Sequence, residues 1–187
     1  MILVTRRRGW QILATALLAL ATLVPSASAQ DEPAFVAPCG DGFEWTAESG
    51  QPILFLCGWG VQGGPGRIVS FLNAYQATLI VKDEQGQPVL TIGPAAFANL
   101  WGDPERGPSG FDDVTCAGPT GGSILWSYVL EGGLPAGTYT VSLDQAFSHP
   151  VNDGFHTCRF ADGTPLASPP SLTSGSDEAV STLIVED

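Results

Sequence analysis

Residues 134–143, Leu-Pro-Ala-Gly-Thr-Tyr-Thr-Val-Ser-Leu, constrain the fold more than any other stretch of the sequence. A proline and a glycine near its start favour a turn, and polar and apolar residues alternate after them. This period of two places Tyr139, Val141 and Leu143 on one face of a strand, in residue types that strands favour. One buried face and one solvated face are typical of an antiparallel sheet, so the stretch predicts a β-rich domain.

Further strand signals recur along the chain, separated by turns rich in glycine and proline. Residues 53–56 form a continuous apolar run, which is typical of a strand covered on both faces. Residues 94–101 predict a short helix, because a proline opens the segment and alanines follow it. The predicted strands are 43–48, 51–59, 67–72, 77–82, 89–92, 123–131, 138–143 and 180–185.

The strands at 123–131 and 138–143 are joined by a short turn, so we expect them to pair antiparallel. About seven to nine short strands, one short helix and many turns indicate an all-β fold, an antiparallel β-sandwich. Residues 161–176, rich in proline and serine, are interpreted as a long surface loop, because the last strand must pair with strands already formed.

The first 29 residues have the pattern of a signal peptide. An arginine run at 6–8 precedes the apolar stretch 12–24, and Ala-Ser-Ala at 27–29 provides small residues for cleavage. The apolar stretch is short for a membrane span, so we expect no stable membrane insertion after cleavage. Residues 30–187 are then a single domain of an exported protein, secreted or held at the cell surface.

The chain is acidic, with a formal net charge of −12. Cleavage of the signal peptide removes three of the few cations and makes the remainder more acidic still. Such a charge repels nucleic acid and anionic lipid, so we expect neither as a partner. An unidentified protein or a glycan is the expected partner.

Four cysteines follow the predicted cleavage site. An even number in an oxidising compartment predicts two disulfides. The pairs Cys39–Cys57 and Cys116–Cys158 close shorter loops than crossed pairing would, so we favour them. The spacing contains no Cys-x-x-Cys pair, which argues against a zinc site.

The segment Leu-Pro-Ala-Gly-Thr-Tyr at 134–139 resembles the strand start Leu-Pro-x-Gly-x-Tyr of secreted bacterial immunoglobulin-like and fibronectin-III-like domains. The resemblance covers about ten residues and implies an Ig-like sandwich in which Tyr139 braces a corner between strands. It implies nothing about function, because this fold carries many functions. No tryptophan lies between two cysteines at the spacing of antibody domains, so the strand order stays open.

Three tryptophans, Trp45, Trp59 and Trp101, lie beside glycines or in loop segments. Exposed aromatic rings on a sandwich can stack on sugars, which makes these residues candidate ligand-binding positions. Burial in the core is the alternative, and it is the common fate of tryptophan.

Acidic residues gather at 103–113, where Asp103, Glu105, Asp112 and Asp113 could offer oxygen ligands to Ca²⁺. The spacing matches no EF-hand, and solvated surface carboxylates are the alternative. Ca²⁺ is the one candidate cofactor. A blue-copper site is excluded because the only methionine is Met1.

His149 and His156 could be combined with Asp144, Asp153 and Ser148 into a hydrolase triad. No Gly-x-Ser-x-Gly motif marks a nucleophile, so we expect the protein to have no catalytic activity. The sequence therefore predicts an exported, non-catalytic β-sandwich that acts in binding or in surface interactions. A carbohydrate-binding module and a secreted hydrolase are the alternatives.

Overall fold

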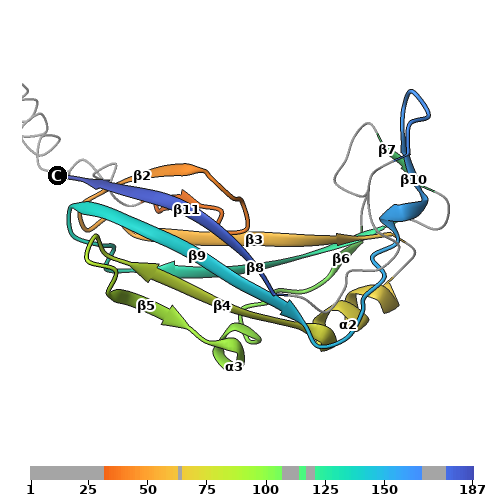
Figure 1. The fold of residues 1–187 in the computed structure, drawn as a ribbon, viewed down its shortest axis with the longest axis horizontal. Coiled ribbons are helices and arrows are strands. Elements are labelled where there is room, and N and C mark those ends of the chain that lie inside the picture. The colour runs from red at the N-terminus through yellow and green to blue at the C-terminus, as the bar shows by residue number, and fades with distance from the viewer. Residues whose placement is uncertain (1–31, 63–64, 107–113, 117–120, 166–175) are drawn as a thin grey trace, which may run out of the picture. The chain divides into compact units, whose positions relative to one another are not determined.

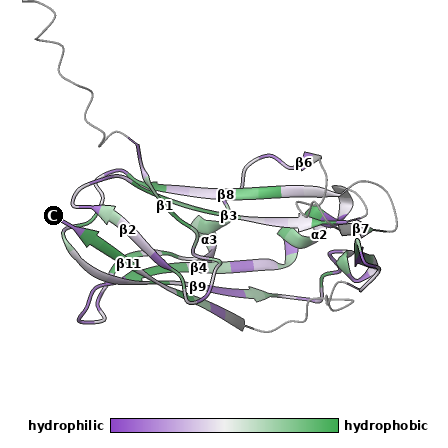
Figure 2. Cartoon of the chain, turned by 90° about the horizontal axis from the view of Figure 1, so that it is seen from above, coloured by the Kyte–Doolittle hydropathy of each residue, from purple (hydrophilic) through white to green (hydrophobic). Residues whose placement is uncertain are grey.

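Two β-sheets face each other, and the core lies between their inner faces (Figure 2). The computed structural model describes residues 32–62, 65–106, 114–116, 121–165 and 176–187. Within it, Pro33–Asp187 forms one compact unit. The fold is all-β, as the sequence predicts, and it contains more than the one short helix expected (Figure 1).

The first sheet has four strands, in the spatial order β1-β3-β8-β6. Its long members β3 and β8 pair antiparallel over their full length, and the short β1 pairs with β3 in parallel. The bounds are β1 Ala34–Val36, β3 Ile53–Val61, β8 Gly122–Leu130 and β6 Glu105–Arg106.

The second sheet has five strands, in the spatial order β2-β11-β9-β4-β5. The C-terminal strand β11 lies inside this sheet, where it pairs antiparallel with β9 and parallel with β2. Both sheets are therefore mixed, because each contains one parallel pair beside the antiparallel ones. The bounds are β2 Glu44–Glu48, β4 Tyr75–Lys82, β5 Pro88–Ile92, β9 Gly137–Phe147 and β11 Ser176–Glu186.

The core lies between the sheets and follows the predicted alternation. Phe55 and Trp126 come from the first sheet, and Leu79, Val141 and Leu183 come from the second; all are almost wholly buried. Burying side chains of this size stabilises a fold by about 1.5–3 kcal/mol each. The alternation in the strands is thus what holds the two layers together.

The predicted pairing of residues 123–131 with 138–143 is wrong. β8 pairs with β3 and β6, whereas β9 pairs with β11 and β4, so the link between β8 and β9 crosses from one sheet to the other. Gly133 adopts φ 56° in this link, and a Cβ there would lie 2.2 Å from the Gln51 carbonyl oxygen. Only glycine fits such a close approach.

Tyr139 lies at the start of β9, directly after this link. Its hydroxyl donates a hydrogen bond of 2.9 Å to the backbone carbonyl of Pro135, four residues upstream. The tyrosine is buried. The bond therefore fixes the start of β9 against the link that precedes it.

The strand predicted at 67–72 is also wrong, because α2 occupies Pro65–Ala74. Ile68, Phe71 and Ala74 recur every three residues, and all three are buried on the face that packs beneath the end of the sandwich. Figure 2 shows α2 between the two layers at this end. The predicted helix at 94–101 is confirmed only in its first turn, α3, Pro94–Phe97.

Both predicted disulfides are present, Cys39–Cys57 and Cys116–Cys158. The second joins directly opposed residues of a small antiparallel pair, β7 (Val114–Cys116) and β10 (Cys158–Phe160). The 3-10 helix η2 (Phe155–Thr157) lies directly before β10. Among the residues that the structure describes, no helix has both the length and the hydropathy of a membrane span.

Candidate ligand-binding pocket

A small hollow opens where α3 meets β4 at one side of the sandwich. Its volume is about 100 Å³, and three aromatic side chains, Tyr75, Phe97 and Trp101, form much of its wall. The wall is completed by Leu72, Ala77, Pro94 and Ala98. Trp101 is one of the three tryptophans that the sequence marks as candidate ligand-binding residues, and the structure places it in a concave site.

Trp101 is positioned by the segment that crosses from β5 in one sheet to the edge of β8 in the other. α3 begins this crossing and buries Phe97 against Trp126, with ring centroids 4.6 Å apart. The backbone of Trp101 then forms an antiparallel bridge with Trp126. Hydrogen bonds from Gly102 N–H to the Leu125 carbonyl (2.8 Å) and from Ser127 N–H to the Leu100 carbonyl (3.3 Å) flank the bridge. The pocket wall therefore rests on a core strand.

The pocket continues inward as a cluster of aromatic rings. Phe71 of α2 is wholly buried. Its ring centroid lies 5.5 Å from that of Trp101, which it meets edge-on, and its ring stacks on Tyr75 at 4.9 Å and on Trp59 at 4.7 Å. Phe147 completes the cluster beside Trp59. Offset and edge-to-face contacts of this kind stabilise a fold beyond simple burial. Trp59 and Trp101 therefore share one cluster, which is both core and pocket wall.

Tyr75 provides the polar group of the pocket. Its hydroxyl donates a hydrogen bond of 3.0 Å to the side-chain carbonyl of Gln145 on β9. Burial raises the pKa of this hydroxyl above its usual range, so it remains protonated at neutral pH. The hydroxyl and the amide of Gln145 are therefore a fixed donor and acceptor pair beside aromatic walls.

A second hollow of about 180 Å³ lies beside the first and has more polar residues in its wall. The two share Ala77 and Pro94 in their walls, and the second adds Asp144 and Gln145. Gln76, Thr78 and Ala146 complete it. Aromatic surface in one hollow and amide, hydroxyl and carboxylate groups in the next are a combination suited to a ligand with an apolar face and several hydroxyl groups.

Trp45 lies elsewhere, on β2, an edge strand of the second sheet. Its ring meets Phe35 at 5.6 Å and Phe43 at 5.8 Å, and both phenylalanines are exposed. The three predicted tryptophans therefore do not form one surface. Within the described residues, the indole N–H groups of Trp45 and Trp59 are buried without a hydrogen-bond partner.

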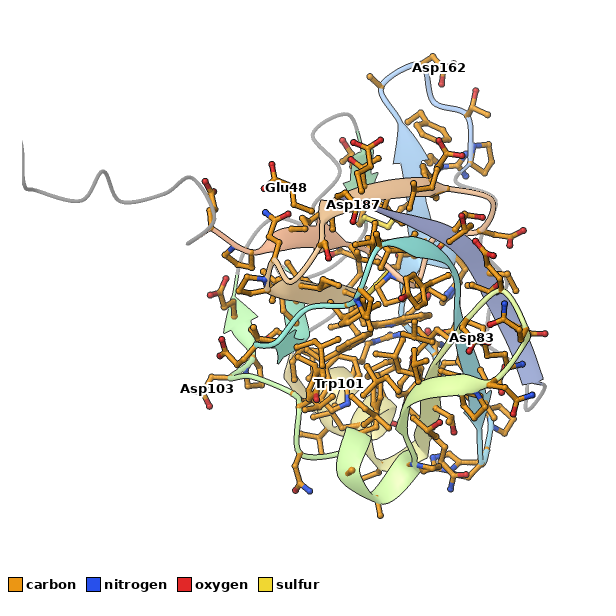
Figure 3. All side chains as sticks on the ribbon, turned by 90° about the vertical axis from the view of Figure 1, so that its left-hand side faces the viewer. Glu48, Asp83, Trp101, Asp103, Asp162 and Asp187 are labelled. Carbon is orange, nitrogen blue, oxygen red and sulfur yellow. A yellow bond between two sulfur atoms is a disulfide. The ribbon has the colours of Figure 1, made fainter. Side chains whose placement is uncertain are left out.

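The predicted Ca²⁺ loop is described only in part. Asp103 and Glu105 are exposed, and Figure 3 shows Asp103 at the periphery, whereas Trp101 lies among the packed side chains. Asp112 and Asp113 lie outside the described residues. In the part of the chain that the structure describes, no three His, Cys, Asp or Glu side chains gather as a metal site.

Of the residues of the hydrolase alternative, Asp144 lies within β9, and the others lie in the segment between β9 and β10. His149 is exposed, with its Nδ1 3.1 Å from the hydroxyl of the adjacent Ser148. Asp153 is only 6% exposed, and its side chain accepts a hydrogen bond from the Phe155 N–H. Burial raises the pKa of Asp153, although that hydrogen bond and the nearby His156 and Arg67 favour the ionised form. The carboxylate hydrogen-bonds within its own turn.

Tyr75, Phe97 and Gln145 are pocket residues that the sequence did not indicate. Tyr75 precedes the predicted strand at 77–82, and Phe97 lies within the predicted helix at 94–101. Gln145 lies beyond the predicted end of its strand at 143, because β9 continues to Phe147.

The fold and the pocket define an all-β sandwich with a small aromatic site at its side. No protein-family model matches the chain, and no curated protein matches it. A family 123 glycoside hydrolase from Clostridium perfringens, described for glycolipid glycan hydrolysis, is similar in structure with a TM-score of 0.35 and 10% sequence identity. The similarity covers 79% of this chain but only 23% of that chain. Similarity at this level carries no argument about function.

Proposed function

We propose that this protein is an exported, non-catalytic binding module whose pocket at Trp101 accepts a sugar ring or a similar small polyhydroxylated ligand. The observation that carries the proposal is the concave site itself, in which Tyr75, Phe97 and Trp101 lie beside the polar groups of Gln145 and Asp144. A sugar ring has an apolar face that stacks on aromatic rings and hydroxyl groups that need such polar partners.

The size of the pocket limits the ligand. Sites for drug-sized ligands enclose about 300–1,000 Å³. The aromatic hollow of about 100 Å³ and its polar neighbour of about 180 Å³ suit one ring or the end of a chain. Specificity would come from the Tyr75 hydroxyl and the Gln145 amide, because their mutual hydrogen bond fixes where a ligand can donate and accept.

Export and an immunoglobulin-like relationship belong to the same proposal. Export is supported by the two disulfides, which form and persist in oxidising compartments. The Ig-like relationship is supported by the hydrogen bond of Tyr139 to Pro135, which has the form of the tyrosine corner of such domains.

The experiment is a titration of the exported, oxidised protein with a panel of soluble monosaccharides and oligosaccharides, followed by tryptophan fluorescence and by calorimetry. At least one sugar should bind with a micromolar to millimolar dissociation constant. Trp101→Phe should weaken that binding because it removes stacking area, and Tyr75→Phe should weaken it because it removes the hydroxyl group.

Trp45→Phe is the matched control, because Trp45 lies at the other sheet edge with no part in the pocket wall. It should leave the affinity unchanged. Absence of binding across the panel would contradict the proposal. So would a sugar whose affinity falls in Trp45→Phe and not in Trp101→Phe.

A further inference from the structure

The outer face of the first sheet is mostly apolar where β3 and β8 lie side by side, with one exposed polar residue, Ser127, among its outward positions. Leu54 and Leu56 project outward from β3 and are half-buried. Leu125 and Val129 project outward from β8 and are 49% and 38% exposed. The outer face of an antiparallel sandwich is ordinarily polar. The apolar run that predicted a strand covered on both sides thus has a second side that is only partly covered.

Glycine makes this face flat. Gly58 pairs with Leu125 across the strands, and a Cβ at Gly58 would lie 2.3 Å from Cδ2 of Leu125. The Leu125 side chain therefore lies flat over Gly58 instead of projecting away from the sheet. A flat apolar surface offers a broad contact to a partner and little to a small molecule.

The dimensions match one helix. This face runs from the pair Leu54–Val129 to the pair Gly58–Leu125, two strands wide and five residues long, and its middle pair joins Leu56 to the exposed, polar Ser127. Strand spacing and rise make this roughly 10 Å by roughly 15 Å. An α-helix is about 10 Å across and rises about 5.4 Å per turn, so three turns cover the face. The flanking strands β1 and β6 have only three and two residues, too few to extend the surface for a second sheet.

The charges around the face indicate the partner. The outward positions of β3 and β8 between Leu54 and Val129 are uncharged, whereas Asp103, Glu105 and Glu131 are exposed at its borders. The chain as a whole carries −12. A second copy would bring acidic borders together, and like charges across an interface oppose association. A partner with basic borders would be attracted.

We propose that the outer face of β3 and β8 is a docking surface for an amphipathic helix of another protein, with an apolar stripe flanked by lysine or arginine. The helix would lie along the two strands, with its apolar stripe on the leucines and Val129. Its basic residues would meet Asp103, Glu105 and Glu131. This surface is separate from the Trp101 pocket, so either proposal can fail without the other.

The experiment uses the exported full domain and a fluorescent synthetic amphipathic helix of leucine and lysine. Binding followed by anisotropy should give a micromolar dissociation constant that weakens as salt is raised. The double variant Leu125→Ser, Val129→Ser should weaken binding by roughly tenfold or more, or about 1.4 kcal/mol, without changing any charge. Both positions are exposed, so the variant should fold.

The matched control is Val89→Ser, another exposed valine, on the edge strand β5 of the other sheet. This variant should bind the leucine and lysine peptide as tightly as the parent protein does. As a second control, an amphipathic helix of leucine and glutamate should not bind the parent protein. Equal loss in Val89→Ser would overturn the proposal, because the loss would then not depend on the face of β3 and β8. Unchanged binding in the double variant would overturn it too, because it would show attraction by overall charge alone. Equal binding of the acidic helix would overturn it too. So would a dimer in sedimentation that the double variant abolishes, because the occupant would be a second copy.

Discussion

Replacement of Trp126 by alanine tests the packing on which both layers depend. The side chain is 1% exposed and contacts Phe97 of α3, so its removal leaves a cavity between the sheets. Truncation of a buried aromatic residue costs about 3–5 kcal/mol. A domain of this size loses about 2–4 °C of melting temperature per kcal/mol, so the midpoint should fall by roughly 6–20 °C.

The assay is thermal unfolding of the oxidised protein by circular dichroism, with Leu125→Ala as the matched control. Leu125 is the next residue on the same strand but faces outward and is 49% exposed. Exposed substitutions change stability by about 0.5 kcal/mol or less, so the control should melt close to the parent. Equal melting temperatures for Trp126→Ala and the parent would refute the account of the core.

Three further predictions concern single interactions. Tyr139→Phe removes the hydrogen bond to the Pro135 carbonyl and should cost about 1 kcal/mol in urea unfolding; an unchanged midpoint would contradict the brace. Asp153→Asn should flatten the dependence of stability on pH. Because burial raises the pKa of Asp153 in the folded state above its unfolded value near 3.8, the native state binds more protons, and parent stability should fall as the pH rises through this interval. If the melting temperatures of parent and variant change with pH in the same way, the Asp153 carboxyl contributes nothing to the pH dependence of stability. Replacing Cys116 and Cys158 by serine should cost about 2–4 kcal/mol, because the bridge closes a long loop of the unfolded chain; a parent-like melting temperature would count against that.

The strands could be predicted because their pattern is local. Alternation in 138–143 and 123–131 specifies which side chains are buried, and the structure buries Val141, Leu143 and Trp126. Strand partners could not be predicted, because they depend on long-range packing. The link around Gly133 crosses between sheets instead of closing a hairpin, as the separate partners of β8 and β9 show.

Helix α2 shows where local pattern misleads. Ile68 and Val69 favour a strand in a short window, while the spacing of Ile68, Phe71 and Ala74 becomes meaningful only when the helix is seen to extend to Ala74. Its buried face then packs in the cluster with Val61 and Ile124. Tertiary contacts therefore decide the conformation of this segment, as they commonly do for short helices.

The candidate pocket was predictable only through Trp101. Its other ring residues, Tyr75 and Phe97, belong to different elements, and no spacing in the sequence links them to it. The crossing from β5 through α3 to the edge of β8 brings them together. Sequence composition could therefore suggest an aromatic site, but the fold had to supply its shape.

The most direct test of the binding function is a nuclear magnetic resonance titration that follows the indole N–H signals of the tryptophans during addition of a sugar identified by calorimetry. The account predicts that the Trp101 signal shifts and saturates, while the signals of Trp45 and the buried Trp126 remain in place. A titration that moves the Trp45 signal and leaves Trp101 unchanged would contradict it.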